Sequence, residues 1–136
     1  MGSEFEIDEE MEPDPDLNRI TNQIIGAAIE VHRQLGPGLM ESLYENALAI
    51  EFTMRNIPFI RQVPVIVNYR DHQIGEVRLD FIVAGRVVVE LKSMESLAPV
   101  HKAQLLCYLK VTRHKLGILI NFNVPALKEG IKRVAN

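Results

Sequence analysis

The sequence predicts an α/β fold in which helices flank one mixed β-sheet. Three observations lead to this prediction. Apolar residues recur every three or four positions early in the chain and again after residue 99, which is the period of a helix. Over residues 63–91 they recur at alternate positions, which is the period of a strand. The chain of 136 residues is 47% hydrophobic, so it can bury the core of one domain.

Glycine and proline mark the ends of the predicted helices. The first helix is expected over residues 17–35 and ends at the Gly-Pro-Gly sequence of residues 36–38. The second is expected over residues 40–55, before the Asn-Ile-Pro sequence of residues 56–58. A third helix is expected over residues 99–111, because proline is tolerated in a first helical turn.

Alternating apolar residues predict an antiparallel three-stranded meander between the second and third helices. Its strands are expected at residues 63–67, 77–83 and 87–91. Pro64 indicates an edge or a bulge in the first of them. Residues 116–122 are mostly apolar and suit a buried strand, whereas residues 124–136 fit either a short helix or an edge strand.

The charged residues are unevenly distributed along the chain. Eight of the 18 acidic residues lie in residues 1–16, which contain no Lys or Arg. We therefore expect residues 1–16 to form a disordered acidic tail, with a start that resembles a cloning remnant, and residues 17–136 to form a single domain. Residues 17–136 contain 15 basic and 10 acidic residues. The formal charge of −3 thus hides a basic domain that suits a nucleic-acid partner.

Cysteine content and hydropathy exclude several classes of protein. Cys107 is the single cysteine, so the chain forms no internal disulfide and holds neither a four-cysteine zinc site nor a cysteine-ligated iron–sulfur cluster. No apolar run approaches the ~18 residues of a membrane span, and the acidic N-terminus is unlike a secretory signal. We expect a reduced protein of the cytoplasm with no membrane partner.

The register of the last two meander strands brings two carboxylates together. Their apolar residues are odd-numbered, and both sets face one core only if paired residue numbers add to an even sum. A short loop centred on Gly85 gives the sum 170, which sets Asp80 directly across from Glu90. Lys92 lies one step further along the same even-numbered face. Such cross-strand neighbours have Cβ atoms about 5 Å apart.

Two interpretations of this pair remain open. Like charges at that separation repel, and Lys92 alone can offset part of the charge of a solvated strand surface. Alternatively, a hard divalent cation bridges Asp80 and Glu90, as Mg²⁺ does when it takes one or two carboxylates and keeps its waters. A cation held in this way serves phosphodiester hydrolysis, with a nearby lysine orienting the attacking water.

Two helices contribute further polar residues. His101, Gln104 and Tyr108 are spaced so that they project from one side of the third helix. Gln104 and Tyr108 either line a carboxylate site or form a half-buried helix boundary. Glu41 lies in the first turn of the second helix, where the helix dipole favours a carboxylate in any case.

Together these residues resemble a known signature. Asp80, followed after nine residues by Glu90-Leu91-Lys92, resembles the motif of the PD-(D/E)XK nuclease superfamily, with Leu79 in place of the proline. The run from Gln104 to Tyr108 matches the Gln-x-x-x-Tyr motif of its RecB-like branch. The run from Gly38 through Glu41 to Tyr44 matches the motif that names the GxxExxY protein family. The resemblance covers roughly residues 17–136.

The resemblance implies a restriction-endonuclease-like core and a role for each matched residue. It implies Mg²⁺ or Mn²⁺ as the cofactor and no iron–sulfur cluster. Lys92 would position or activate the attacking water, and Gln104 and Tyr108 would contact phosphate or ordered water. The implied metal ligands are Asp80, Glu90, the Leu91 carbonyl, Glu41 directly or through water, and, as a further candidate, His32.

The leading hypothesis for function is a Mg²⁺- or Mn²⁺-dependent nuclease, an exonuclease by its branch, that hydrolyses phosphodiester bonds in DNA. The alternative is a catalytically inactive nucleic-acid-binding or regulatory module on the same fold. Basic residues outnumber acidic ones by seven to one after Leu97, which supports phosphate contacts in either case. The small size of the chain also raises the hypothesis of a homodimer or of a partner subunit that completes the substrate groove.

Overall fold

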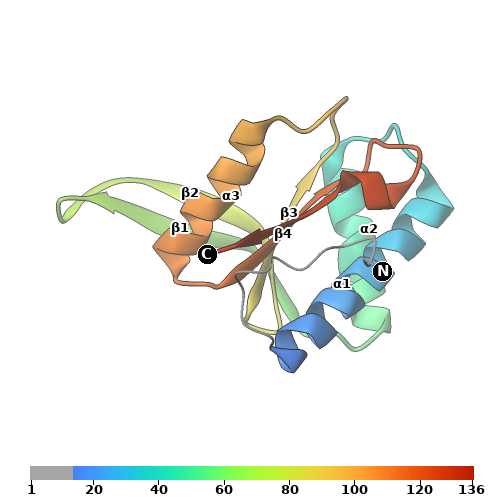
Figure 1. The fold of residues 1–136 in the computed structure, drawn as a ribbon, viewed down its shortest axis with the longest axis horizontal. Coiled ribbons are helices and arrows are strands. Elements are labelled where there is room, and N and C mark those ends of the chain that lie inside the picture. The colour runs from blue at the N-terminus through green and yellow to red at the C-terminus, as the bar shows by residue number, and fades with distance from the viewer. Residues whose placement is uncertain (1–13) are drawn as a thin grey trace.

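The computed structural model describes residues 14–136 as three α-helices, one 3₁₀ helix and five strands (Figure 1). The elements in chain order are α1 (Pro15–Leu35), α2 (Glu41–Met54), β1 (Phe59–Tyr69), β2 (His72–Val83), β3 (Val87–Lys92), α3 (Pro99–Thr112), β4 (Leu116–Asn121), η1 (Leu127–Gly130) and β5 (Ile131–Ala135).

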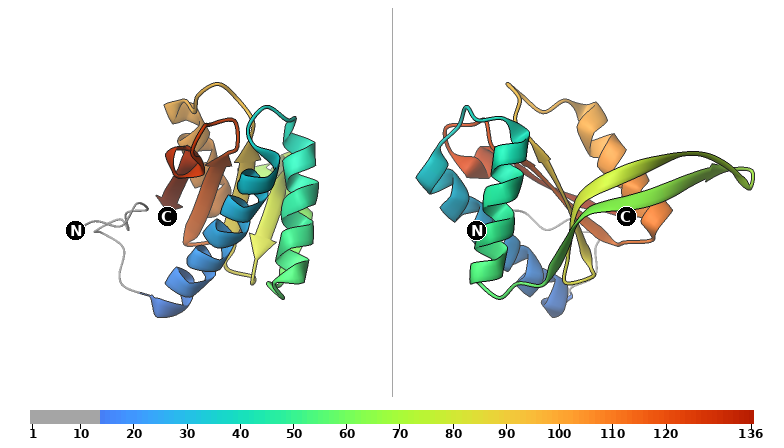
Figure 2. Two further views of the ribbon diagram at one scale, coloured as in Figure 1. Left: turned by 90° about the vertical axis from the view of Figure 1, so that its right-hand side faces the viewer. Right: turned by 180° about the vertical axis from the view of Figure 1, so that it is seen from behind.

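The five strands form one mixed sheet in the order β1-β2-β3-β4-β5. Strands β1, β2 and β3 are antiparallel neighbours, as the meander predicts, and β5 is antiparallel to β4. Strands β3 and β4 are parallel, and α3 makes the crossover between them. Helices α1 and α2 cover one face of the sheet and α3 covers the other (Figure 2). The predicted α/β fold class is confirmed.

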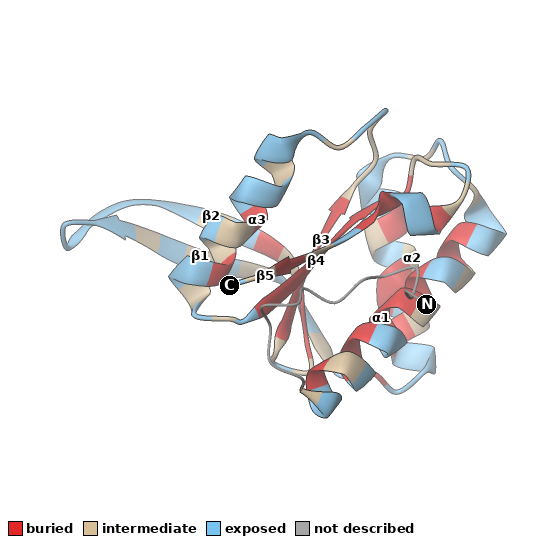
Figure 3. Ribbon diagram, viewed as in Figure 1, coloured by how far each residue is buried: buried red, intermediate tan, exposed pale blue. Residues whose placement is uncertain are grey.

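A separate apolar core lies on each face of the sheet. The larger one is between the sheet and helices α1 and α2, and its largest side chains include Tyr44, Phe52, Phe81 and Phe122. The smaller one lies under α3. In Figure 3 the buried residues follow the central strands and the inner sides of the helices. Strand β3, buried on both faces, is apolar at consecutive positions for this reason.

Helix α1 begins two residues earlier than predicted. The carboxylate of Asp14 accepts hydrogen bonds from the backbone N–H groups of Asp16 and Leu17, and Pro15 occupies the first turn. The prediction of an acidic tail over residues 1–16 is therefore wrong for residues 15 and 16, because capping by Asp14 starts the helix there. Residues 1–13 of that predicted tail lie outside the described residues.

Strands β1 and β2 change faces of the sheet near Asp80. Phe81 packs in the core beneath α1 and α2, but Leu79 packs in the core under α3 together with Val63 and Val65. The prediction that all odd-numbered residues of the meander share one face is therefore wrong. The physical reason is a sharp local twist, because the β1–β2 ladder pairs no residues at Gln62 and Asp80 and Gln62 has φ of +52°.

The two ambiguous segments are now assigned. Residues 131–135 form an edge strand, preceded by the single 3₁₀ turn η1. Gly130 between them touches the end of β4 so closely that a Cβ atom would lie 2.1 Å from the Asn121 carbonyl oxygen. At the other side of the sheet β1 is the opposite edge, which explains how it accommodates Pro64. No helix within residues 14–136 is long and apolar enough to cross a bilayer.

The loop between α1 and α2 is held by two hydroxyl groups. The buried Tyr44 hydroxyl donates to the Gly36 carbonyl and accepts from the Leu39 N–H at 3.2 Å, while its ring stacks on Phe122 with centroids 4.5 Å apart. The Ser93 hydroxyl, just after β3, donates to the Leu39 carbonyl. The start of α2 is thereby tied to the end of β3.

Tyr44→Phe should destabilise the protein while leaving the fold intact. The change keeps the ring stacked but deprives two backbone groups of their hydrogen-bond partner, which costs about 1–2 kcal/mol. We expect a melting temperature roughly 3–6 °C lower, measured by circular dichroism. Thr53→Ala, which removes an exposed hydroxyl bonded to the Ala49 carbonyl within α2, is the control and should shift it much less.

Candidate active site

The candidate site lies where β2 and β3 part. The pairs Phe81↔Val89, Ile82↔Val88 and Val83↔Val87 all add to 170, so the predicted register is confirmed over these three pairs. The ladder stops there, and Asp80 and Glu90 are the next residues on the two strands. On its other side, Asp80 also lacks a β1 partner, because pairing skips the row of Gln62. The sheet is thus interrupted along one transverse row.

The carboxylates of Asp80 and Glu90 replace the missing backbone partners. The Asp80 N–H donates to Glu90 Oε1 at 3.2 Å, and the Leu91 N–H donates to Asp80 Oδ2 at 2.8 Å. Each acid therefore accepts a hydrogen bond from the opposite strand. This exchange satisfies backbone donors that the open ladder would leave unpaired, and it brings both carboxyl groups into the fork between the strands.

Both acids are held where ionisation is unfavourable. Glu90 is only 7% exposed. Burial, followed by the charge of Asp80 and a hydrogen bond with it, raises the pKa of Glu90 to about 9. Burial also raises the pKa of Asp80, although the hydrogen bond from Leu91 opposes that rise. Without a cation, the fork favours a state in which the pair retains a proton.

Lys92 provides one positive charge beside the pair. It is the last residue of β3, half-buried, and lies next to Asn121 in the β3–β4 ladder. Its charge acts against the pKa rises of Asp80 and Glu90, but burial and carboxylate repulsion are the larger causes for Glu90. A single lysine therefore compensates the charges of the two acids only in part.

Glu41, on α2, lies close enough to the fork to interact electrostatically with Asp80. Its side chain is exposed at the first turn of the helix. Partial desolvation raises the pKa of Glu41, the charge of Asp80 adds to this rise, and Lys92 opposes it. The loop that Tyr44 and Ser93 hold in place precedes this residue directly. Glu41 is thus brought toward the pair, with no hydrogen bond to either acid among the described contacts.

Helix α3 contributes Tyr108 from the opposite face of the sheet. Its side chain is half-buried, and burial followed by the charges of Glu90 and Asp80 raises the pKa of Tyr108. Gln104 lies one turn earlier on α3 and is exposed. The structure therefore brings Tyr108 into the field of the fork and leaves Gln104 on the helix surface beside it.

His32 is occupied elsewhere. It is buried near the end of α1, with Nε2 2.8 Å from the Val124 carbonyl oxygen and its ring 6.4 Å from that of Phe122. This contact joins α1 to the segment after β4. No described contact links His32 to Asp80 or Glu90, so the structure gives this histidine a packing role.

The sequence did not predict a cluster of polar side chains on the β1 side of the interrupted row that contains Asp80 and Glu90. The Glu45 carboxylate accepts hydrogen bonds from Arg61 and Gln62, both at 2.7 Å. These bonds hold Gln62 in its left-handed conformation beside Asp80, and the charge of Glu45 contributes to the raised pKa of Asp80. The sequence feature that could have identified Glu45 is its position one helical turn after Glu41.

Asn121 was also missed, and it fixes the segment after β3. Its buried side chain accepts hydrogen bonds from the N–H groups of Met94 and Asn123 and donates to the Met94 carbonyl. Because Asn121 lies beside Lys92, this triple contact anchors the chain directly after the Glu-Leu-Lys sequence. A single asparagine after an apolar run does not predict this anchoring role from the sequence.

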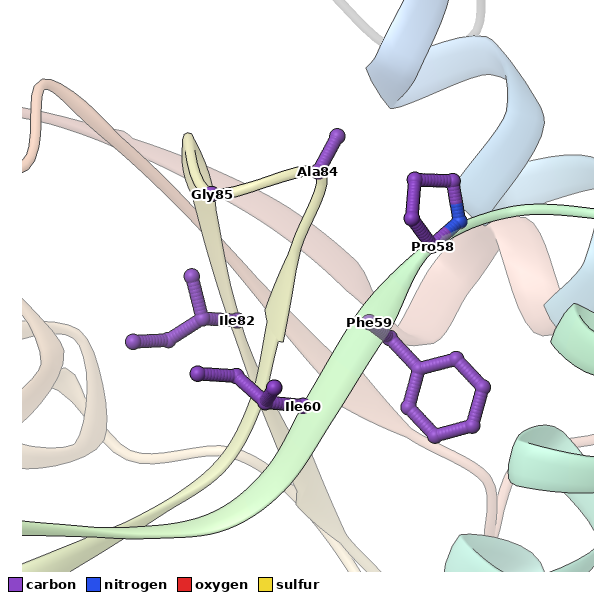
Figure 4. A pocket seen from close by; sticks show the side chains of 6 residues that line it. All are labelled: Pro58, Phe59, Ile60, Ile82, Ala84 and Gly85. Atoms are coloured by element: carbon purple, nitrogen blue, oxygen red, sulfur yellow. The ribbon is translucent and has the colours of Figure 1, made fainter.

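An apolar pocket elsewhere on the protein lacks comparable chemistry. A shallow pocket at the base of β1 and β2 is lined by Pro58, Phe59, Ile60, Ile82, Ala84 and Gly85 (Figure 4). None of these side chains ionises, so the pocket offers no acid, base or ligand for a cation. Within residues 14–136, no group of three or more His, Cys, Asp or Glu side chains converges as a metal cage. The paired acids at the fork are the relevant feature.

The comparisons agree with this geometry. The family model of the PD-(D/E)XK nuclease superfamily matches residues 18–134, which is most of the chain. The chain belongs to the PD-(D/E)XK nuclease superfamily. No curated protein and no solved structure matches it significantly. The fork brings Asp80 and Glu90 together, Lys92 lies two residues after Glu90, and Leu79 is a core residue.

Glu90→Gln should stabilise the metal-free protein at neutral and higher pH. Because the pKa of Glu90 is raised in the folded state, its contribution to stability is complete below the unfolded pKa and is lost as the pH rises toward about 9. The uncharged amide avoids this loss. In EDTA at pH 8 we expect a melting temperature at least about 3 °C above wild type, with a flatter pH profile.

Glu129→Gln is the control for that measurement, because Glu129 is an exposed acid on η1. It should leave the melting temperature and its pH dependence unchanged. An E90Q variant less stable than wild type at pH 8 would contradict the assignment of a repulsive carboxylate pair.

Proposed function

We propose that this protein is a divalent-metal-dependent nuclease that hydrolyses phosphodiester bonds in DNA. The observation that carries the proposal is the pair of buried Glu90 and half-buried Asp80 at the fork of β2 and β3, with Lys92 on the same strand as Glu90. A buried acid pair that lacks full charge compensation costs stability unless a cation joins it. Membership of a nuclease superfamily supports the same function.

The residues fit a small, hard cation. Among the described residues no group of three or more acids, histidines or cysteines forms a metal cage, and a pair of carboxylates suits Mg²⁺ or Mn²⁺, because Mg²⁺ keeps several waters and binds through one or two carboxylates. Asp80 and Glu90 would hold the ion, with the Leu91 carbonyl as a further oxygen and Glu41 acting through water. His32 is left out of this set, since its contact with Val124 accounts for its position.

Each residue of the chain has a distinct task in the proposed reaction. A bound divalent cation supplies charge stabilisation at the phosphoryl oxygens and a water of lowered pKa. Lys92 donates a hydrogen bond that orients the attacking water. Tyr108, and Gln104 one turn away, contact the phosphate from α3. Tyr44 fixes the loop that carries Glu41, so the acid approaches the fork at a defined position.

We also propose that the chain belongs to the GxxExxY family and to the RecB-like branch, whose members include exonucleases. The first assignment is supported by the role of Tyr44, whose hydroxyl braces the Gly36–Leu39 loop before Glu41. The second is supported by Gln104 and Tyr108, which occupy one flank of α3 with Tyr108 in the field of the acids. Substrates with free ends should therefore be cleaved in preference to closed circles.

Cleavage should require both the cation and the acid pair. We expect wild-type protein to degrade linear DNA in Mn²⁺ and to stop in EDTA. Asp80→Asn and Lys92→Ala should each lower the rate at least about 100-fold, because one removes a ligand charge and the other the group that orients water. The rate is measured by release of labelled nucleotides. Arg19→Ala, which replaces an exposed arginine on α1, should retain activity within about twofold.

The melting temperature of each variant distinguishes a loss of catalysis from a loss of folded structure in this experiment. Asp80→Asn keeps a side-chain oxygen for the Leu91 N–H and removes charge repulsion, so its melting temperature should not fall in EDTA. Cleavage that persists equally in D80N and in EDTA would contradict the mechanism and indicate a contaminating nuclease.

A specific charge pattern favours the second candidate function, a nucleic-acid-binding module without catalysis. The ion pairs found among the described residues all involve arginines before residue 87. Lys102 and Lys110 on α3 and Lys132 on β5 are exposed and take part in none of them. Lys132 and Val134 are two residues apart on β5, so their side chains face the same side of the sheet. Val134 packs under α3, and Lys132 therefore lies on the face that α3 covers. Cations without acidic partners are suited to phosphate contacts.

Salt dependence tests whether these lysines contact a nucleic-acid backbone. Each lost phosphate contact should reduce the slope of log affinity against log salt by about 0.9. We expect the triple variant Lys102→Gln, Lys110→Gln and Lys132→Gln to lower the slope by up to about 3 for duplex DNA in EDTA, equally for unrelated sequences. Arg19→Gln and Arg33→Gln, which replace ion-paired arginines, serve as the control. An unchanged slope in the triple variant would refute the contact.

A further inference from the structure

Strands β1 and β2 continue well beyond the body of the protein. They contain 11 and 12 residues, whereas β3 and β4 contain six each. Residues 66–75, named the arm here, include the turn between them, and none of these residues joins either apolar core. In Figures 1 and 2 the arm projects past α3 as a two-stranded ribbon. The arm therefore adds little to the packing of the domain.

The turn at the end of the arm is strained in a way that packing does not enforce. Tyr69 pairs with His72, and the two residues between them, Arg70 and Asp71, have φ of +48° and +65°. A two-residue turn with both φ values positive prefers Asn-Gly, because other residues meet steric strain there. All four residues are exposed. The two-residue hairpin requires both positive φ values, but Asn-Gly would meet this requirement with less strain, so the choice of Arg and Asp points to a function of the side chains themselves.

The side chains displayed on the arm are types that bind other molecules. The Arg70 guanidinium lies 5.6 Å from the centre of the Tyr69 ring, which is itself 60% exposed. Ile66 and Ile74 are 45% and 66% exposed. An exposed two-stranded ribbon with large apolar residues promotes aggregation unless a partner covers it. The length and composition of the arm therefore indicate that a partner binds it.

We propose that the arm is a DNA-binding element that enters the major groove of a duplex whose backbone lies at the Asp80–Glu90 fork. This inference rests on the proposed nuclease function. The major groove admits a two-stranded ribbon, and arginine at its end reaches phosphates or guanine edges. The arm is also a direct continuation of β2, the strand that carries Asp80, so a substrate at the fork lies along its path.

The reach of the arm defines which substrates it contacts. His72 and Asp80 are eight residues apart on β2, which corresponds to about 26 Å of strand. At the spacing of duplex DNA this is roughly eight base pairs from the scissile phosphate. Apolar Ile66 and Ile74 would contact thymine methyl groups or sugar edges, while Arg70 supplies the charge contact.

The test exchanges the strained turn for a relaxed one. Arg70→Asn together with Asp71→Gly keeps the ribbon and removes the arginine, so the protein should melt no lower than wild type. Binding to a labelled 30-base-pair duplex, measured by fluorescence anisotropy in EDTA at low salt, should weaken at least about fivefold. Tyr69→Ala is a second variant that leaves the turn residues unchanged and should weaken binding in the same way.

Arg33→Asn, an exposed arginine on α1, is the matched control and should bind as wild type. Wild-type binding with no loss in either arm variant would overturn the arm inference and leave the nuclease proposal standing. Failure of wild-type protein to bind duplex DNA would instead refute the proposed function. A wild-type dimer in sedimentation that dissociates with Ile66→Thr and Ile74→Thr would also overturn the inference, since the arm would then serve a second copy of the chain.

Discussion

The repulsion between a buried and a half-buried carboxylate governs the centre of this molecule. Asp80 accepts a hydrogen bond from the Leu91 N–H at 2.8 Å and Glu90 accepts one from the Asp80 N–H at 3.2 Å, in place of the regular ladder. This arrangement satisfies the N–H groups but leaves like charges together in a desolvated fork, which raises the pKa of Glu90 to about 9. The β2–β3 ladder ends directly before this row.

Much of the surrounding structure holds elements around this row. Tyr44 and Ser93 tie the loop before α2 to the end of β3, and Asn121 anchors the segment after Lys92. From the β1 side, Glu45 holds the left-handed Gln62. None of these residues supplies a ligand or base in the proposed reaction. They are needed because an interrupted sheet row cannot position its own side chains, so neighbouring loops and helices must do so.

The sequence predicted the carboxylate pair because buried neighbours determine strand register. Val87 and Val89 must face one core, and with a short turn at Gly85 this parity leaves Asp80 next to Glu90. The same argument failed for Leu79, which packs under α3, because parity assumes a continuous strand and Gln62 interrupts the neighbouring one. The hydrophobic periodicity of a sequence does not indicate that a glutamine adopts a positive φ. It also could not predict that His32 binds the Val124 carbonyl, which is a contact between residues 92 positions apart.

The interrupted row also explains why one short chain contains both a compact domain and a free ribbon. Because β1 and β2 twist at Gln62 and Asp80, their continuation crosses to the α3 face, where Val63 and Val65 still find a core. Residues further along pass beyond that core and gain no such contact. Under the proposed function, the acids would shape the substrate-facing surface as well as the reaction centre. A cation joining the pair would reduce the repulsion and stabilise the folded state increasingly as its free concentration rises above its dissociation constant, so ligand binding and folding stability are thermodynamically linked at this fork.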